Sequence, residues 1–193
     1  MPRVGIFALQ GDFAAHGKAL DELDVEWQLV KMPAELETVQ GLIIPGGESS
    51  TLLKLMTPIA MRPALEAFHA QGRPIFGTCA GLILLAQETR QPAQESLGFI
   101  EITAGRNAYG RQIDSFIDMG TPIATALGST PLEMVFIRAP KILQLSPHVT
   151  PLATWQDDVV LARQRHILVS AFHPELSTDR RVHRYFLDMI PTA

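Results

Sequence analysis

The chain has 193 residues, of which 47% are hydrophobic, and it contains 14 glycines and 14 prolines. Its 16 basic and 20 acidic residues give a formal charge of −4, which does not favour binding to the phosphates of a nucleic acid. This composition is typical of a globular α/β protein with a sizeable core, and we expect one domain over residues 1–193.

The first half of the chain alternates strand-like and helix-like segments. Strands are predicted over residues 4–9, 26–30, 42–44 and 74–76. Helices are predicted over residues 13–23, 50–56, 63–71 and 82–86. This alternation predicts a parallel sheet with helices on both faces.

The second half has a different pattern. Residues 100–117 form shorter and more polar segments, which predict antiparallel strands added to the sheet. Segments 87–94 and 146–154 contain prolines and are interpreted as surface connections. Further strands are predicted at 135–138, 159–163 and 167–172, and a closing helix at 180–190.

One cysteine excludes an internal disulfide and suits a reducing compartment. No apolar run is long enough to cross a bilayer, and no signal peptide precedes the first predicted strand. We therefore expect a cytoplasmic protein. Several histidines lack the spacing of metal ligands, so we expect surface or helix positions, and no bound metal, for His16, His69, His148, His166 and His183.

The single cysteine, Cys79, has a glycine two positions before it and another two positions after it, Gly77 and Gly81. It lies between the predicted strand 74–76 and the predicted helix 82–86. This is the pattern of a nucleophile elbow, a tight strand-to-helix turn that needs small neighbours. The helix dipole also favours an anion at Cys79. By itself the elbow leaves two interpretations equally open, a nucleophile and a buried cysteine that only packs.

His173-Pro174-Glu175 follows the apolar segment 167–172, so it is predicted at the same sheet edge as Cys79. Pro174 favours an extended backbone at His173, in which residues two apart project to the same side. His173 then accepts the thiol proton, while Glu175 orients the imidazole and stabilises its charged form. The alternative is a surface turn, but the combination with the elbow favours a Cys-His-Glu triad.

A glycine pair lies in the segment Pro-Gly-Gly-Glu-Ser-Ser-Thr at 45–51, directly after the third predicted strand. Two glycines let the backbone turn its N–H groups outward, which suits the stabilisation of an oxyanion. The candidate donors are the N–H groups of Gly47 and Ala80, with the side-chain amide of Gln10 as a further one. Such a pair also occurs in ordinary turns, so its position at the same edge is the reason for this assignment.

These segments together resemble the class I, or triad, glutamine amidotransferases. The shared motifs are the loop at 45–49, Gly-Thr-Cys-Ala-Gly-Leu at 77–82 and Phe-His-Pro-Glu at 172–175. Three more segments resemble the family of glutaminase subunits of pyridoxal 5'-phosphate synthase: Leu-Gln-Gly at 9–11, Arg-Asn-Ala-Tyr-Gly-Arg-Gln-Ile-Asp-Ser-Phe at 106–116 and Phe-Ile-Arg-Ala-Pro at 136–140. The resemblance covers essentially the whole chain. It implies a flavodoxin-like three-layer sandwich, and hydrolysis of L-glutamine through a γ-glutamyl thioester without metal or cofactor.

The resemblance also implies how free glutamine is bound. The matching positions in this chain are Gly47, Glu48, Ser49, Arg106, Ile137 and Arg138. We expect Glu48 to bind the α-ammonium and an arginine to bind the α-carboxylate, because opposite charge and bidentate geometry suit these groups. Without the resemblance, Arg106 and Arg138 would be interpreted as surface arginines.

Ammonia released into neutral water becomes largely ammonium, so its productive use requires a docked acceptor enzyme. The resemblance implies that this partner is the (β/α)8-barrel subunit of pyridoxal 5'-phosphate synthase, in a complex with up to twelve copies of each chain, for vitamin B6 biosynthesis. Three alternatives stay open: a cysteine peptidase or deglycase on the same scaffold, a glutaminase that serves a different synthase, and a non-catalytic regulatory module. The presence of Cys79, His173 and Glu175 argues against the regulatory module.

Overall fold

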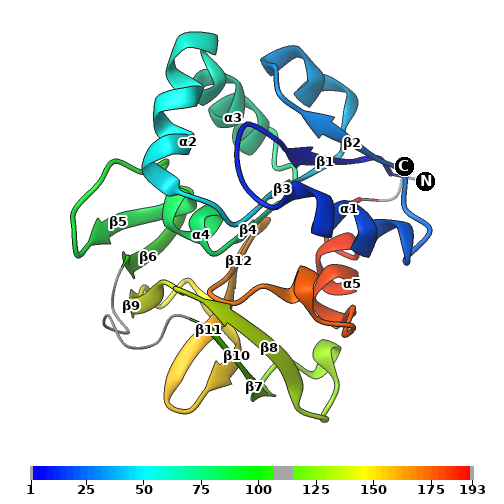
Figure 1. The fold of residues 1–193 in the computed structure, drawn as a ribbon, viewed down its shortest axis with the longest axis vertical. Helices are drawn as coiled ribbons and strands as arrows, with labels where there is room; N and C mark the ends of the chain where they lie inside the picture. Colours follow the sequence, from blue (N-terminus) through cyan, green and yellow to red (C-terminus); the bar gives the residue numbers. More distant parts are fainter. Residues whose placement is uncertain (1, 107–114, 192–193) are drawn as a thin grey trace.

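The computed structural model describes residues 2–106 and 115–191, and its main feature is a nine-stranded sheet (Figure 1). In spatial order the strands are β2 (Trp27–Val30), β1 (Val4–Phe7), β3 (Gly41–Ile44), β4 (Ile75–Thr78), β12 (Ile167–Ser170), β11 (Asp158–Gln164), β10 (Thr150–Trp155), β7 (Ser115–Pro122) and β8 (Leu132–Ile137). The strands from β2 to β12 pair in parallel. Those from β12 to β8 pair antiparallel. The parallel half has the flavodoxin-like strand order, which confirms the predicted fold class.

Helices cover both faces of the parallel half. The α-helices are α1 (Phe13–Asp21), α2 (Ser49–Met56), α3 (Met61–Ala70), α4 (Ala80–Leu85) and α5 (Arg181–Leu187). Four 3-10 turns connect the elements of the described residues: η1 (Pro33–Thr38), η2 (Thr57–Ile59), η3 (Thr125–Leu127) and η4 (Pro174–Leu176). The rings of Phe76 in β4 and Phe186 in α5 lie 5.6 Å apart between centroids, and His16 of α1 meets the same Phe76 ring. Helices α1 and α5 therefore share one face, and α4 packs on the other.

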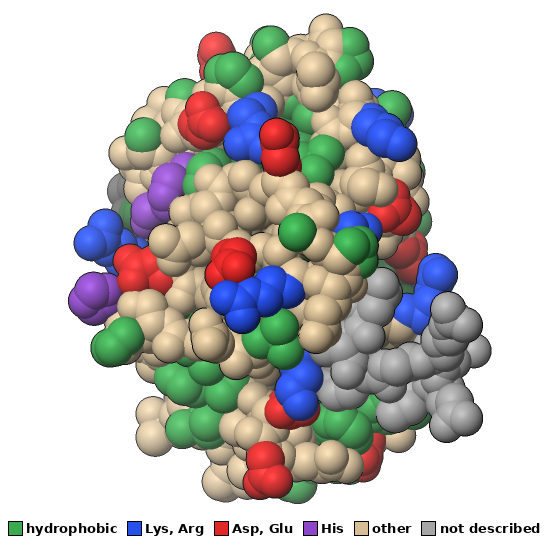
Figure 2. Space-filling view, turned by 90° about the vertical axis from the view of Figure 1, so that its left-hand side faces the viewer, with side chains coloured by type: hydrophobic (Ala, Val, Ile, Leu, Met, Phe, Trp, Pro, Cys, Tyr) green, Lys and Arg blue, Asp and Glu red, His purple; other side chains and the backbone are tan. Residues whose placement is uncertain are grey.

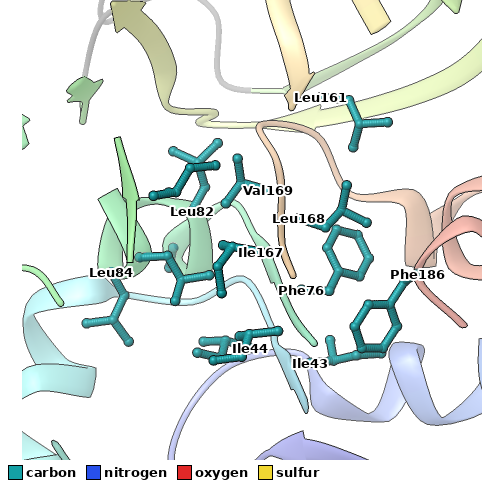
Figure 3. Packing of buried hydrophobic residues seen from close by; sticks show 14 of the residues in the cluster. Ile43, Ile44, Phe76, Leu82, Leu84, Leu161, Ile167, Leu168, Val169 and Phe186 are labelled. Carbon is teal, nitrogen blue, oxygen red and sulfur yellow. The ribbon is translucent and has the colours of Figure 1, made fainter. Parts of the chain in front are cut away.

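The core follows from the alternation of side chains along the buried strands. Figure 3 shows Ile43, Phe76 and Leu168 on the side of Phe186, and Ile44 and Ile167 on the side of α4. All five of these strand residues are at most 1% exposed. Strands buried on both faces are continuously apolar, as in the Gly-Leu-Ile-Ile sequence of β3, and this explains why they were predicted correctly from the sequence.

A second, three-stranded sheet corrects part of the sequence prediction. It consists of β5 (Ala86–Arg90), β6 (Ile100–Gly105) and β9 (Lys141–Leu145). The sequence analysis expected residues 100–117 to add strands to the main sheet. This is wrong for residues 100–105, which form β6 of the second sheet, and correct for β7, which belongs to the main sheet. Part of segment 87–94 is not a connection but the strand β5, whose polar residues are tolerated because β5 lies at the edge of its sheet.

Strand β10 corrects the interpretation of segment 146–154 as a surface connection. Its sequence contains Pro151, which usually argues against a strand. The pairing with β11 changes register between Pro151 and Ala153, so an irregularity accommodates the proline. Beside it, Lys141 of β9 forms an ion pair with Asp158 of β11 at 2.8 Å, which links the two sheets.

The surface carries mixed charge. On the face shown in Figure 2, basic side chains lie next to acidic ones. The ion pairs among the described residues include Arg90 with Glu88 at 2.8 Å and Arg62 with Glu95 at 3.7 Å. Within the described ranges, the structure contains no helix that is both long and apolar enough to cross a membrane.

Candidate active site

A cavity of about 490 Å³ opens at the carboxyl ends of the parallel strands. The segments after β1, β3, β4 and β12 each contribute to its wall, as expected for the edge where α/β sheets bind ligands. The lining residues are Gln10, Gly11, Asp12, Gly46, Gly47, Glu48, Ser49, Cys79, Ile83, Arg106, Ile137, Arg138, His173 and Leu176. The fold therefore brings together segments that the sequence analysis placed at one edge. Ala80 and Glu175 do not line the cavity.

Cys79 lies in a strained turn between β4 and α4. Its φ of 50° and ψ of −101° are unusual for a residue with a side chain, and this is the geometry of a nucleophile elbow. A Cβ atom on Gly77 would lie 2.6 Å from the carbonyl carbon of Gly81, and one on Gly81 would collide with the backbone oxygen of Ile44. Both small residues are thus required, as the sequence pattern predicted. Cys79 is 8% exposed, and its sulfur lies 4.0 Å from the carbonyl oxygen of Ile137.

His173 and Glu175 form a buried pair beside the cavity. Nδ1 of His173 lies 2.7 Å from Oε1 of Glu175, and the Glu175 side chain is fully buried. The predicted proximity is confirmed, but the predicted reason is wrong. Glu175 lies in the 3-10 turn η4, for which His173 is the N-cap, so a tight turn and not an extended backbone brings the two side chains together.

The environment of His173 favours its charged form. Burial disfavours an imidazolium, but the neighbouring Cys79 sulfur and the Glu175 carboxylate outweigh it and raise the pKa of His173 to about 10. Since the carboxylate can only accept, the hydrogen of this contact belongs to Nδ1. The other ring nitrogen, Nε2, has no hydrogen-bond partner among the described residues. Catalytic contacts are often long before substrate binds, so proton exchange through this nitrogen stays a prediction.

The glycine loop after β3 is held by the segment that follows β1. The N–H of Asp12 donates to the carbonyl oxygen of Gly46 at 3.1 Å, and the N–H of Glu48 donates to Oε1 of Gln10 at 2.8 Å. A Cβ atom on Gly46 would collide with the His173 ring, so a glycine is needed where the loop passes this side chain. Gln10 therefore contacts the loop through its carbonyl oxygen, and its role as an oxyanion donor stays a prediction.

Glu48 has a structural role that the sequence analysis did not anticipate. Its Oε2 accepts from the N–H of Thr51 at 2.7 Å and from the hydroxyl of Ser50 at 2.6 Å, which makes it the N-cap of α2. These hydrogen bonds lower the pKa of Glu48 to about 2. Its Oε1 makes longer contacts, including one of 3.3 Å with Nη2 of Arg106. The glutamate and one arginine expected to bind the two charges of glutamine thus pair with each other.

The remaining predicted binding residues also line the cavity. Arg138 has a φ of 41° directly after β8, so the chain turns sharply there. The hydroxyl of Ser49 donates to Oε1 of Gln94 at 3.1 Å. Residues 107–114 of the predicted motif at 106–116 lie outside the described residues.

Two apolar lining residues were missed by the sequence analysis, Ile83 and Leu176. Both residues lie close in sequence to a predicted catalytic residue, and this spacing could have identified them. Ile83 lies one helical turn after Cys79, and therefore on the same side of α4. Leu176 directly follows Glu175. Such residues could have been found by extending each motif along its own helix.

Comparison with known proteins places the chain in one family. The model of the SNO glutamine amidotransferase family matches residues 6–192. The chain is 45% identical to a protein of Thermotoga petrophila and 44% identical to one of Thermosipho africanus, each named pyridoxal 5'-phosphate synthase subunit PdxT, over 97% of this chain and 99% and 98% of theirs. A solved structure described as a glutamine amidotransferase has a TM-score of 0.89 and 42% identity, and the match covers 97% of this chain and 98% of that one. The chain therefore belongs to the SNO glutamine amidotransferase family.

Proposed function

We propose that the chain, as one glutaminase domain over residues 1–193, hydrolyses L-glutamine to L-glutamate and ammonia. The observation that carries the proposal is the cavity that combines Cys79 and His173 with the charged pair Glu48 and Arg106. A thiol and an imidazole can perform acyl transfer on many substrates. Two opposite charges in the same cavity suit the ammonium and carboxylate of a free amino acid. A peptidase or deglycase would not need that pair.

The chemistry proceeds by acyl transfer to sulfur. Cys79 attacks the side-chain carbonyl carbon of glutamine, and N–H groups of Gly47 and Ala80 stabilise the oxyanion, with Gln10 as a further candidate. His173 protonates the departing nitrogen, so that ammonia leaves and a γ-glutamyl thioester remains. Water then gives up a proton to His173 and attacks the thioester, which releases glutamate and restores the thiol. Glu175 orients the imidazole throughout.

Glutamine binding would exchange the partners of the charged pair. The α-carboxylate competes for Arg106, with Arg138 beside it, and the α-ammonium takes the freed Oε1 of Glu48. This exchange is supported by the long contacts of Oε1, since the short hydrogen bonds that cap α2 all use Oε2. Glu48 and Arg106 therefore each have a partner of opposite charge both before and after glutamine binds. Ser49 and Ile137 complete the wall around the substrate.

We further propose that the ammonia passes to a pyridoxal 5'-phosphate synthase subunit with a (β/α)8 barrel, in a complex of up to twelve copies of each chain. The names of the relatives from Thermotoga petrophila and Thermosipho africanus, each a subunit of that synthase, support this partner. A cytoplasmic location belongs to the proposal, because a single free cysteine suits a reducing compartment.

Release of glutamate from glutamine, measured with and without the synthase subunit, tests the function. We expect little turnover by the isolated chain, because Gly46 and Gly47 leave the loop conformationally free, so that its N–H groups need not point at the oxyanion until the partner docks. Docking that aligns one oxyanion donor would raise kcat by about 10²–10³. Absence of glutamate release in both conditions would contradict the proposal, and equal kcat in both would contradict only the activation.

A γ-electrophilic glutamine analogue tests the binding assignment separately. It should label Cys79, and the added mass should be absent in Cys79→Ala. An analogue without the α-amino group should label much more slowly if Glu48 binds the ammonium. Equal labelling by both analogues would show that Glu48 acts only as the helix cap.

A further inference from the structure

A group of buried polar side chains lies behind the triad, on the side away from the cavity. Its members are His16 of α1, Thr78 of β4, Glu175 of η4 and His183 of α5, and none of them is more than 4% exposed. Nε2 of His16 lies 3.2 Å from Oγ1 of Thr78 and 3.4 Å from Oε2 of Glu175. Nδ1 of His16 lies 3.1 Å from Nε2 of His183. The mechanism above uses neither histidine, and the sequence analysis expected surface or helix positions for both.

The second oxygen of Glu175 needs a partner. Oε1 accepts from His173, but Oε2 has no hydrogen bond of good geometry among the described residues. A buried carboxylate oxygen without a donor is costly, and it favours the protonated acid. The ring nitrogen of His16 lies within ion-pair distance of this oxygen.

The hydrogens of this group can be assigned by elimination. Burial lowers the pKa of His16, so its ring is neutral and carries one hydrogen. Nε2 also faces Oε2 of Glu175, and a carboxylate can only accept, so this arrangement favours the hydrogen on Nε2, where Oγ1 of Thr78 accepts it at 3.2 Å and Oε2 lies 3.4 Å away. Nδ1 of His16 is then an acceptor, and His183 donates to it from Nε2. Nδ1 of His183 is left without a hydrogen, which agrees with its lack of a partner in the described part of the chain.

We infer that His16 is a positioning residue for the triad, held in its tautomer by His183, and that it keeps Glu175 ionised by placing the positive end of its Nε2–H dipole beside Oε2. This inference rests on the proposed function, because it assigns His16 a role through Glu175 and His173. Three elements meet at His16 besides its own helix, so the group also fixes η4 against β4 and α5.

Other charged groups near His16 do not replace this role. They are Asp12, His173 and Arg180, besides Glu175 itself. Arg180 donates from Nε to Glu22 at 2.7 Å and from Nη1 to Pro174 at 3.4 Å, so its guanidinium is directed to other partners. His173 already uses Oε1. His16 is thus the group placed to serve Oε2.

The test uses the full chain in complex with the synthase subunit, and two measurements. The first is the pH profile of Cys79 alkylation by iodoacetamide, read by mass spectrometry, which is unambiguous because the chain has one cysteine. The second is kcat and KM for glutamate release. In His16→Leu, Glu175 loses the N–H beside Oε2, so its carboxylate stabilises the imidazolium of His173 less. The midpoint of the alkylation profile should rise by about 1 pH unit or more, as for the loss of a neighbouring opposite charge. We expect kcat at neutral pH to fall about tenfold, with KM unchanged.

Three further variants separate positioning from mere packing. His16→Gln keeps an N–H donor and should return the midpoint toward that of the wild type. His183→Leu should give a smaller shift in the same direction, and it serves as the test if His16→Leu does not fold. Leu20→Ala removes a fully buried side chain from the same helix, and this apolar side chain offers no hydrogen-bond donor to Glu175. It should lower the melting temperature and leave the midpoint unchanged.

The outcomes are distinguishable. An unchanged midpoint in folded His16→Leu, equal shifts in the Gln and Leu variants, or an equal shift in Leu20→Ala would each overturn the inference. Suppose that the wild type releases no glutamate while the midpoint of Cys79 alkylation still rises in His16→Leu relative to the wild type. In that case the glutaminase proposal fails and the positioning role of His16 stands.

Discussion

Replacing Cys79, the proposed nucleophile, by glycine should give a more stable protein than replacing it by alanine, and both variants should lack activity. Cys79 has a φ of 50° and a ψ of −101°, which is unfavourable for a residue with a Cβ atom. Such a conformation costs about 1–3 kcal/mol. Glycine adopts it without that cost, but loses about 0.5–1 kcal/mol through its greater freedom in the unfolded chain.

We compare the free energies of unfolding of two variants that both lack the thiol. Cys79→Ala keeps the Cβ atom and therefore the strain, whereas Cys79→Gly removes both. Subtracting the entropic cost of glycine from the strain leaves the glycine variant more stable than the alanine variant by up to about 2.5 kcal/mol. For a chain of this length the melting temperatures should differ by about 2–4 °C per kcal/mol.

The assay is urea unfolding followed by circular dichroism, with a matched control on an ordinary helix. Ala67→Gly changes an exposed residue in the middle of α3, where glycine should destabilise by about 1 kcal/mol. The sign of the alanine-to-glycine effect should therefore reverse between the two sites. If glycine at position 79 is destabilising to the same extent as at position 67, the elbow stores no strain and the reasoning is refuted.

Three other changes probe separate parts of the structure. Gly81→Ala should place a Cβ atom against the backbone oxygen of Ile44, and we expect a loss of about 1–3 kcal/mol in urea unfolding together with lower activity; wild-type stability would contradict the close packing. Burial lowers the pKa of His183 to about 3, below its ordinary value of 6.5, so stability from this group is present above pH 6.5 and is lost as the pH falls toward 3, by up to about 1.4 kcal/mol per pH unit. The free energy of unfolding, measured between pH 3 and 6.5, should depend less steeply on pH in His183→Phe than in the wild type. Equal pH dependence of the two proteins would refute the assignment. Arg181 donates to three backbone carbonyls and to Asp179, so Arg181→Met should cost about 1–3 kcal/mol, measured against the small loss expected for Arg3→Met at an exposed ion pair.

The features that the sequence could predict are those set by neighbouring residues. The elbow needs small residues two positions from Cys79, and a short motif contains all of them. Likewise, a buried parallel strand such as β3 is apolar at every position, so its sequence alone predicts it. The contact between His173 and Glu175 was also predictable because the two residues are two positions apart, although the turn that creates it was not.

Only the tertiary structure decided which distant segments meet. Arg106 pairs with Glu48 across 58 positions, and His16 meets His183 across 167. Nothing in the local sequence separates an arginine on the surface from one in a cavity, or a histidine on a solvated helix from one buried behind a triad. Strands β5 and β10 were missed for a related reason. The polar residues of β5 are tolerated because this strand lies at the edge of its sheet, and the proline of β10 is tolerated because the pairing with β11 is irregular there. Local sequence determines backbone conformation over a few residues, whereas burial and charge pairing depend on packing between elements that are remote in the chain.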